Sequence, residues 1–495
     1  MKRSVFALLL VCLACQPAEV ATDTTGTTGT TGTQPPPQQQ VQYVAINPDV
    51  YVPKATIDGW INANPIDTAA IAQHAWAIWG GMTADSGQTL NGTPLPVWET
   101  WYDSTEVYAA GAGSGPSPAA LAEKLKAAGP KERKANVKRI FHLPHQSLTH
   151  GKTGNAPDPL GTAGSSEAVV LTFNRFTQEF RDHVWANQYY DSNVLTALNN
   201  SWTSNTPIQD RTIKVFPDRA IMLKPVFVVV SGTQPTAVPY WNGTGTNATA
   251  DPLNPTSDTW KQCVLADPTG KATNSQPLVC NQGNKGETTM PAGSYQVVPI
   301  SATPSESGFY AIKMTQEEVD DMKALAQIDQ LQGAQAGDFA LFVASHVSSR
   351  EIDNWTWQTF WWSPTPATPP SAPPNALSPP ATIAKPWNMY VACTAYYMVT
   401  PPNAPNGQPL FCYNPYLETD LSGLENKDMT QQATGVSSNC MTCHRAAAWP
   451  ENQYAQAFLL RPDDPKWFAA NTKTDFAWSM VNLAHTPPFV PAPGK

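Results

Sequence analysis

The stretch Cys440-Met441-Thr442-Cys443-His444, near the C-terminus, decides how the chain around it is expected to fold. Two thiols three residues apart, followed at once by an imidazole, are what covalent attachment of a c-type haem requires. Each sulfur adds to one vinyl group of the porphyrin, and the histidine takes the proximal position on the iron. A disulfide redox pair and half of a zinc site are the alternatives, but neither a second ligand pair nor a βαβ pattern accompanies the motif. We therefore expect one covalent haem c, attached at Cys440 and Cys443 and ligated by His444.

The residue on the other face of the iron decides between electron transfer and catalysis. Met480 and His485 are the only methionine and histidine after His444, which makes them the nearest candidates for the sixth ligand. The chain beyond His444 is short for a complete cytochrome c domain, so upstream elements are expected to complete the pocket. His346 and Met429 are therefore candidates as well, and the sequence leaves all four open.

The N-terminus carries a signal for export. Lys2 and Arg3 precede an apolar run that is too short to span a bilayer as a helix. The run ends at Cys15 in a Leu-Ala-Cys sequence that resembles the lipobox of bacterial lipoproteins, in which the cysteine is lipidated and becomes the new N-terminus. Residues 1–14 are thus expected to be a signal peptide, with a plain secretory signal as the alternative.

A low-complexity segment, residues 16–40, follows the lipobox. Its Thr-Thr-Gly repeats and its proline and glutamine runs have almost nothing to bury, so a disordered tether is expected. Gln16 after the cysteine favours sorting to the outer membrane, by analogy with known lipoproteins. The protein is accordingly expected to be an exported periplasmic or cell-surface lipoprotein that touches the membrane through its lipid anchor alone. Export agrees with the haem motif, because bacteria attach c-type haem outside the cytoplasm.

The composition favours an extracytoplasmic protein with many loops and aromatic side chains. Charged residues make up only 14% of the chain, against about 25% in typical domains, while prolines (48) and tryptophans (17) are abundant. The formal net charge of −9 argues against general binding of nucleic acid. No nucleic-acid partner is therefore expected.

Four cysteines remain after Cys12 and Cys15 are assigned to the signal region and Cys440 and Cys443 to the haem motif. In an oxidising compartment an even remainder predicts two disulfides. Three pairings are possible, and we favour the one that is local in sequence, Cys263 with Cys280 and Cys393 with Cys412. Each of these bonds would close a loop and contribute about 3 kcal/mol.

The hydrophobic periodicity alternates between helix and strand and predicts the α+β class. We expect a loop-rich α+β body over residues 41–386 and a mostly helical haem-binding region over 387–495, packed on the body. Helices are expected at 67–79, 173–190 and from 315, and strands at 97–102, 212–216, 221–230, 339–347, 355–362 and 390–399.

Several blocks of sequence occur together with the haem motif. They are PVWETWY at 96–102, the expected helix 173–190, Ala344-Ser345-His346 leading to WTWQTF at 355–360, and TDFAWSM at 474–480. Together they resemble a little-characterised family of exported bacterial cytochrome c-like proteins with one C-terminal CxxCH motif. The resemblance implies thioether attachment at Cys440 and Cys443 and proximal ligation by His444. It does not supply a reaction.

Electron transfer by a lipid-anchored monohaem c-type cytochrome, with a redox partner protein, is the first functional expectation, because it needs only the motif and the export signal. An extracytoplasmic, peroxidase-like haem oxidoreductase with an open sixth position is the first alternative, supported by a chain much longer than one haem needs. A haem-based binding or sensor lipoprotein is the second. No serine-hydrolase elbow, P-loop or dinucleotide fingerprint is present.

Overall fold

A computed structural model gives the fold of the chain. It describes residues 41–108, 139–144, 170–241, 260, 262–281, 287–326, 331–368, 375–404, 406–418, 438–452 and 461–484. The chain divides into two units, Met1–Gln38 and Gln39–Lys495, and all described residues belong to the second. The expected signal peptide, Cys15 and the expected tether thus lie outside the described residues. Within the described residues, no helix is both long and apolar enough to cross a membrane.

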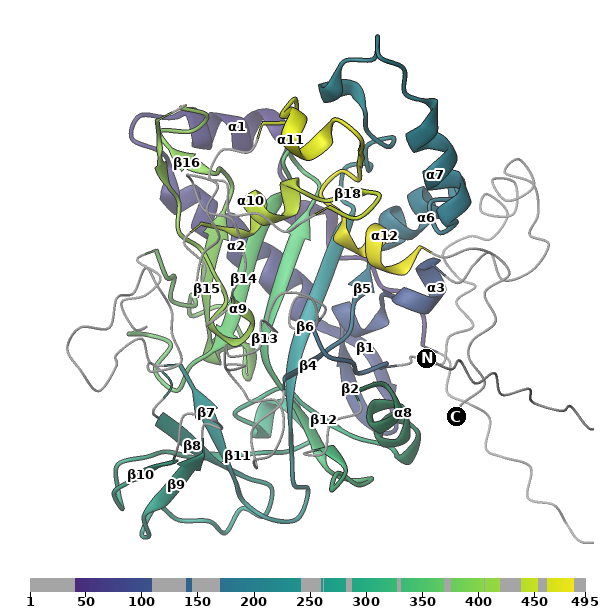
Figure 1. The fold of residues 1–495 in the computed structure, drawn as a ribbon. Helices are drawn as coiled ribbons and strands as arrows, with labels where there is room; N and C mark the ends of the chain where they lie inside the picture. The colour runs from purple at the N-terminus through teal and green to yellow at the C-terminus, as the bar shows by residue number, and fades with distance from the viewer. Residues whose placement is uncertain are drawn as a thin grey trace, which may run out of the picture. The chain divides into compact units, whose positions relative to one another are not determined.

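A central antiparallel sheet of eight strands organises the protein (Figure 1). Its strands follow the order β15-β14-β13-β6-β5-β3, while β12 pairs with β13 and β4 pairs with β6. These strands are β3 (Tyr102–Asp103), β4 (Val170–Thr172), β5 (Arg175–Phe176), β6 (Ile221–Val230), β12 (Ala311–Lys313), β13 (Phe339–Ser349), β14 (Thr356–Trp362) and β15 (Tyr390–Ala395).

Smaller sheets surround the central one. A three-stranded sheet pairs β7 (Thr236–Tyr240), β8 (Gln262–Asp267) and β11 (Val297–Pro299). The remaining strands form two-stranded ladders. These ladders are β1 (Asp85–Leu90) with β2 (Thr93–Pro96), β9 (Leu278–Asn281) with β10 (Glu287–Met290), β16 (Val399–Thr400) with β17 (Gln408–Pro409), and β18 (Ala448–Trp449) with β19 (Thr472–Lys473).

The helices are mostly short. The α-helices are α1 (Lys54–Asn62), α2 (Thr68–Thr83), α3 (Ser104–Tyr108), α6 (Gln178–Ala186), α7 (Ser192–Ser201), α8 (Gln316–Ala326), α9 (Pro415–Glu418), α10 (Cys440–Arg445), α11 (Pro465–Phe468) and α12 (Trp478–Leu483). Single turns of 3-10 helix are η1 (Pro48–Val50), η2 (Val97–Thr100), η3 (Ile208–Asp210), η6 (Pro304–Glu306) and η8 (Trp387–Met389).

Helix α2 covers one face of the central sheet. It begins where the sequence predicts, because the Asp67 carboxylate accepts a hydrogen bond from the Ala70 amide at 2.9 Å and caps the first turn. Trp79 of α2 stacks on Phe360 of β14, with ring centroids 4.0 Å apart, and both side chains are fully buried. Tyr390 of β15 lies 5.3 Å from the same indole. This face is therefore a filled aromatic core.

The other face of the sheet lies under the C-terminal helices. Helix α10 contacts β14, and in Figure 1 α10 and α12 lie in front of the sheet while α2 lies behind it. Every residue of β14 is buried, since both of its faces are covered.

The fold-class prediction is wrong. The described residues contain nineteen strands in several, mostly antiparallel sheets and few helices, not an α+β body. In the C-terminal region, predicted to be mostly helical, β15 to β19 form strands, and helices α9 to α12 have only four or six residues each. Strands only two residues long leave no local period to detect, wherever their partners lie in the sequence.

Three local predictions fail. The expected strand 212–216 contains only an isolated bridge, between Thr212 and Lys473. The phenylalanines of the expected helix 173–190 suggest a single helical face, but Phe176 belongs to β5 and α6 begins only at Gln178. The expected strand 97–102 is instead the 3-10 turn η2 followed by β3.

Four cysteines lie in pairs at disulfide distance. The Cα atoms of Cys263 and Cys280 are 5.7 Å apart, and so are those of Cys393 and Cys412. The first pair lies in a small cluster beside β8 and β9. The second links β15 to the segment that precedes α9.

Candidate functional site

Helix α10 carries the motif that runs from Cys440 to His444, and the residue that precedes the helix fixes its start. The Asn439 side chain caps the helix by accepting a hydrogen bond from the Thr442 amide at 3.3 Å. The amide nitrogen of the same side chain donates to the Leu410 carbonyl at 2.8 Å. A spacing of three residues then places Cys440 and Cys443 on one side of the helix.

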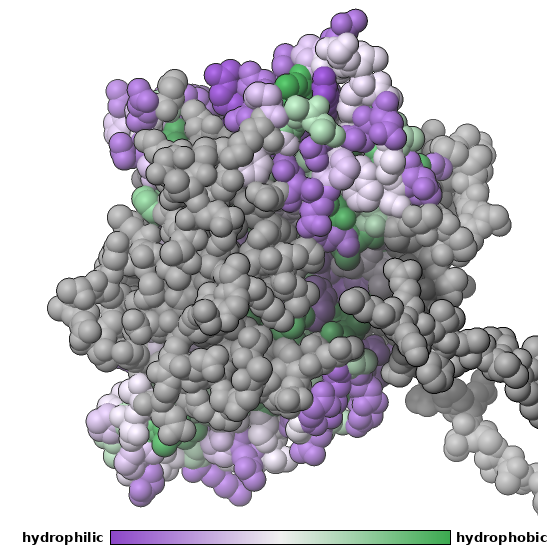
Figure 2. All heavy atoms as spheres, viewed as in Figure 1, coloured by the Kyte–Doolittle hydropathy of each residue, from purple (hydrophilic) through white to green (hydrophobic). Residues whose placement is uncertain are grey.

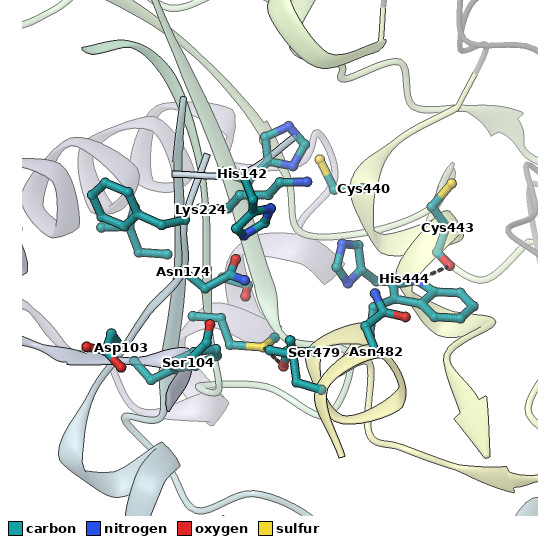
Figure 3. A pocket seen from close by; sticks show the side chains of 18 of the residues that line it. Asp103, Ser104, His142, Asn174, Lys224, Cys440, Cys443, His444, Ser479 and Asn482 are labelled. Atoms are coloured by element: carbon teal, nitrogen blue, oxygen red, sulfur yellow. Dashed lines mark hydrogen bonds between the residues drawn. The ribbon is translucent and has the colours of Figure 1, made fainter. Parts of the chain in front are cut away.

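A cavity of about 450 Å³ lies between α10, α12 and the open face of the central sheet. Cys440, Cys443 and His444 all line it. In Figure 3 these three side chains lie on one side of the cavity, and those of His142, Asn174 and Lys224 lie on the other. Figure 2 shows hydrophobic residues in a recess near the middle of this face. The sequence motif thus opens onto one partly open, mainly apolar recess.

The central sheet supplies the floor of this cavity. Lys224 of β6 pairs directly with His346 of β13, and two residues along the strands Met222 pairs with Ser348. Ser348 in turn pairs with Trp357 of β14. Residues opposite one another in antiparallel strands project from the same face, which explains why all five line one cavity.

The ring of His444 is oriented by the backbone. Its Nδ1–H donates to the Phe476 carbonyl at 2.9 Å, and its ring centroid lies 4.2 Å from that of Trp357. This bond fixes the tautomer in which Nε2 is the nitrogen that can ligate a metal. Burial lowers the pKa of His444 to about 3, with the hydrogen bond to Phe476 acting in the opposite sense. The imidazole is therefore neutral at pH 7, the form that binds iron.

The carbonyl that holds His444 comes from an unusual piece of backbone. Asp475 and Phe476 have φ angles of 46° and 67°, the left-handed region that non-glycine residues rarely adopt. The Asp475 carboxylate secures the turn by accepting a hydrogen bond from the Phe216 amide at 2.8 Å, and the Arg350 guanidinium lies 3.4 Å away. Such strain is retained where the surrounding structure holds it in place, often at functional sites.

The two thiols of the motif differ in exposure. Cys440 is 8% exposed, and Cys443 is half-buried. Burial, with a smaller contribution from the charge of Glu418, raises the pKa of the Cys440 thiol well above its ordinary value. Neither cysteine forms a disulfide, so both sulfurs remain available for thioether bonds.

The candidate sixth ligands are placed differently. His346 lines the cavity, with its Nε2 3.0 Å from Oε1 of Glu418. Met480 is buried in the core, and its neighbour Ser479, rather than Met480 itself, lines the cavity. Met429 and His485 lie outside the described residues.

Sequence reasoning missed three charged residues of the cavity, Asp103, Lys224 and Glu418. Burial lowers the pKa of Lys224 to about 8, and the charge of Glu418 partly opposes that shift. The expected strand 221–230 could have suggested that Met222 and Lys224 share a face, because side chains two residues apart in a strand project to the same side. Nothing local could have placed them beside α10.

The residues of the cavity fit a covalent haem. Within the described part of the chain, no group of three or more His, Cys, Asp or Glu side chains could hold a metal ion by itself. A porphyrin brings its own equatorial nitrogens, so the protein needs to supply only axial ligands and attachment points. Cys440 and Cys443 would attach the haem, and His444, with its tautomer fixed, would ligate the iron.

Comparisons with models of protein families, with curated proteins and with solved structures found no match for this chain. The interpretation of the site therefore rests on its own residues.

Proposed function

We propose that the protein is a monohaem c-type cytochrome that transfers electrons. The observation that carries the proposal is the meeting of Cys440, Cys443 and His444 in one mainly apolar cavity, with the His444 Nδ1–H donated to the Phe476 carbonyl. When bound, the haem would supply a one-electron couple at its iron. The hydrogen bond to Phe476 holds the imidazole in one orientation, and Trp357 packs against its ring.

The setting that we propose follows from the N-terminal sequence. The chain would be exported and anchored in a membrane, most simply the outer membrane, through a lipid on Cys15, with residues 16–40 as a tether. A protein held by such a tether would meet its redox partner protein by diffusing within the reach of residues 16–40. The apolar side chains that line much of the cavity would limit the access of water to a bound haem, which would influence its potential.

Haem content after denaturation tests the proposal. The full chain is expressed in a bacterium that matures c-type cytochromes, boiled in detergent and stained for haem in a gel. We expect the wild type to retain haem, Cys443→Ala to retain less, and the Cys440→Ala/Cys443→Ala double variant to retain none. The matched control is Cys263→Ala/Cys280→Ala, which removes two cysteines away from the cavity and should keep its haem. A haem-free wild type, or a double variant that still stains, would refute the proposal.

A second candidate, a haem oxidoreductase with an open sixth position, is favoured by one observation. Lys224, His346 and Glu418 bring groups that can donate and accept protons into the cavity, with His346 Nε2 3.0 Å from Glu418 Oε1. Optical spectra of the purified protein separate the two candidates. A low-spin spectrum unchanged by cyanide or carbon monoxide supports electron transfer, whereas a high-spin spectrum that responds to both supports the enzyme.

A further inference from the structure

A second cavity, of about 650 Å³, lies beside the segment that follows the haem motif. Helix α10 separates it from the first cavity, because successive residues of a helix point about 100° apart. His444 lines the first cavity, and the next residue, Arg445, lines the second. The other residues used below, Lys54, Asn354 and Arg461, also line this second cavity.

Two of the three cations in this cavity are neutralised by carboxylates. The Lys54 ammonium lies 2.6 Å from Asp58 and 3.5 Å from Asp353. The Arg461 guanidinium lies 3.0 Å from Asp463. Both cations are well exposed, with 48% and 71% of their side-chain surface accessible, so water stabilises their charge as well.

Arg445 is the exception. Its Nη2 donates to the Asn354 side-chain oxygen, and its guanidinium lies 5.4 Å from the centroid of the Phe476 ring. Its Nε is buried and has no hydrogen-bond partner, and among the described residues no carboxylate pairs with this guanidinium. Buried donors and charges are normally satisfied, because leaving them unpaired costs several kcal/mol.

We propose that this second cavity binds a small organic oxyanion, a carboxylate or a phosphate ester, on the guanidinium of Arg445. Planar and tetrahedral oxyanions match the fork of N–H donors on arginine. A volume of about 650 Å³ is in the range of sites for organic ligands and exceeds what an inorganic ion needs. Lys54 and Asp58 at the rim can meet further polar groups of such a ligand.

The part of the wall that Tyr396 forms is held in place by a buried hydrogen-bond network. Tyr396, which lines the cavity, has its hydroxyl 2.7 Å from His74 Nδ1 and accepts a hydrogen bond from the Gln358 side chain at 2.9 Å. His74 Nε2 in turn lies 3.1 Å from the Glu351 carboxylate. All four side chains are buried, so the wall does not need to reorganise when a ligand enters.

The test measures thermal unfolding of the full chain as purified, in chloride buffer at constant ionic strength. Phosphate, acetate and citrate are titrated separately, so that the three probes distinguish phosphate from carboxylate recognition. We expect at least one of them to raise the midpoint temperature in a saturable manner. Arg445→Gln should weaken that response at least tenfold, and Arg445→Lys, which keeps the charge but loses the fork, should weaken it less.

Arg461→Gln is the matched control, because it removes an exposed cation of the same cavity that Asp463 already neutralises, and its response should stay within about twofold of the wild type. The proposal fails if no probe gives a saturable rise, or if Arg445→Gln responds like the wild type. Should Arg445→Gln not fold, an undiminished response of Arg445→Lys decides against it. This inference is independent of the proposed haem, and haem staining of the same samples keeps the two tests distinct.

Discussion

Strand β14 carries an aromatic side chain on each of its two faces, and the surroundings of the two side chains differ. Phe360 faces α2, where Trp79 stacks on it at 4.0 Å in a core that is filled on every side. Trp357 faces the other way, toward α10, where its ring lies 4.2 Å from that of His444 and borders a cavity of about 450 Å³. A cavity lowers stability, and this one lies on the face of the strand that carries Trp357. One face therefore stabilises the fold, and the other holds the candidate site.

The largest effect is expected on the filled face. Trp79→Ala should lower the free energy of unfolding by about 3–5 kcal/mol, because it empties a fully buried site with several aromatic neighbours. Urea unfolding followed by circular dichroism measures the loss. Covalent haem per folded molecule should stay at the wild-type value, and a parallel loss of haem would show that the two faces are not separate.

Trp357→Ala is the matched change on the cavity face. Its expected effect on unfolding is smaller, about 2–3 kcal/mol, because Trp357, although buried, packs against two rings, those of His444 and Phe476, whereas the ring of Trp79 has four such neighbours. The optical spectrum should change, since the ring that packs against His444 is gone. Equal destabilisation by the two alanine variants, with an unchanged spectrum, would contradict the contrast drawn between the faces.

His183 of α6 is expected to make the folded state less stable in acid. Burial lowers the pKa of His183 to about 4, from an ordinary 6.5, although its hydrogen bond to the Lys214 carbonyl opposes that shift. The unfolded chain therefore takes up a proton first as the pH falls, and stability that is complete above pH 6.5 is lost on the way to pH 4. At pH 5 the loss should be about 2 kcal/mol.

The measurement compares urea midpoints at pH 7.5 and pH 5 for the wild type and for His183→Gln. The variant should lack this part of the pH dependence while sharing the contributions of all other groups. Identical pH dependence in both proteins would mean that His183 does not titrate as described.

The smallest effect is expected at the edge of the cavity. The Tyr108 hydroxyl of α3 lies 2.9 Å from the Ser479 hydroxyl of α12. Tyr108→Phe should cost about 1 kcal/mol, the usual net value of one hydrogen bond. Combining it with Ser479→Ala in a double-mutant cycle isolates the coupling between the two side chains, and a coupling energy of zero would remove this link between α3 and α12.

The parts of the structure that depend on near neighbours in sequence could be predicted. The motif itself names Cys440, Cys443 and His444, and an aspartate at the right offset gives the start of α2. Both rest on spacings of a few residues, which a sequence displays directly.

The rest depends on pairings across long stretches of chain. Lys224 faces the cavity because β6 pairs with β13, more than a hundred residues later. The Phe476 carbonyl accepts the hydrogen bond of His444 although the two residues are 32 positions apart in the sequence. No local sequence pattern predicts the turn that brings them together. The prediction of a mostly helical C-terminal region fails for another reason, since β16 to β19 are only two residues long and are stabilised by their pairing rather than by a pattern in their own sequence.

The left-handed turn at Asp475 and Phe476 has a consequence for how such a sequence can evolve. Glycine at either position would relax the backbone, and a search for higher stability would find that change early. At Asp475 the same change would also remove the carboxylate that accepts the hydrogen bond of the Phe216 amide, and the carbonyl that sets the ring of His444 would be held less firmly. Selection for a stable fold and selection for a fixed imidazole therefore act in opposite directions at Asp475.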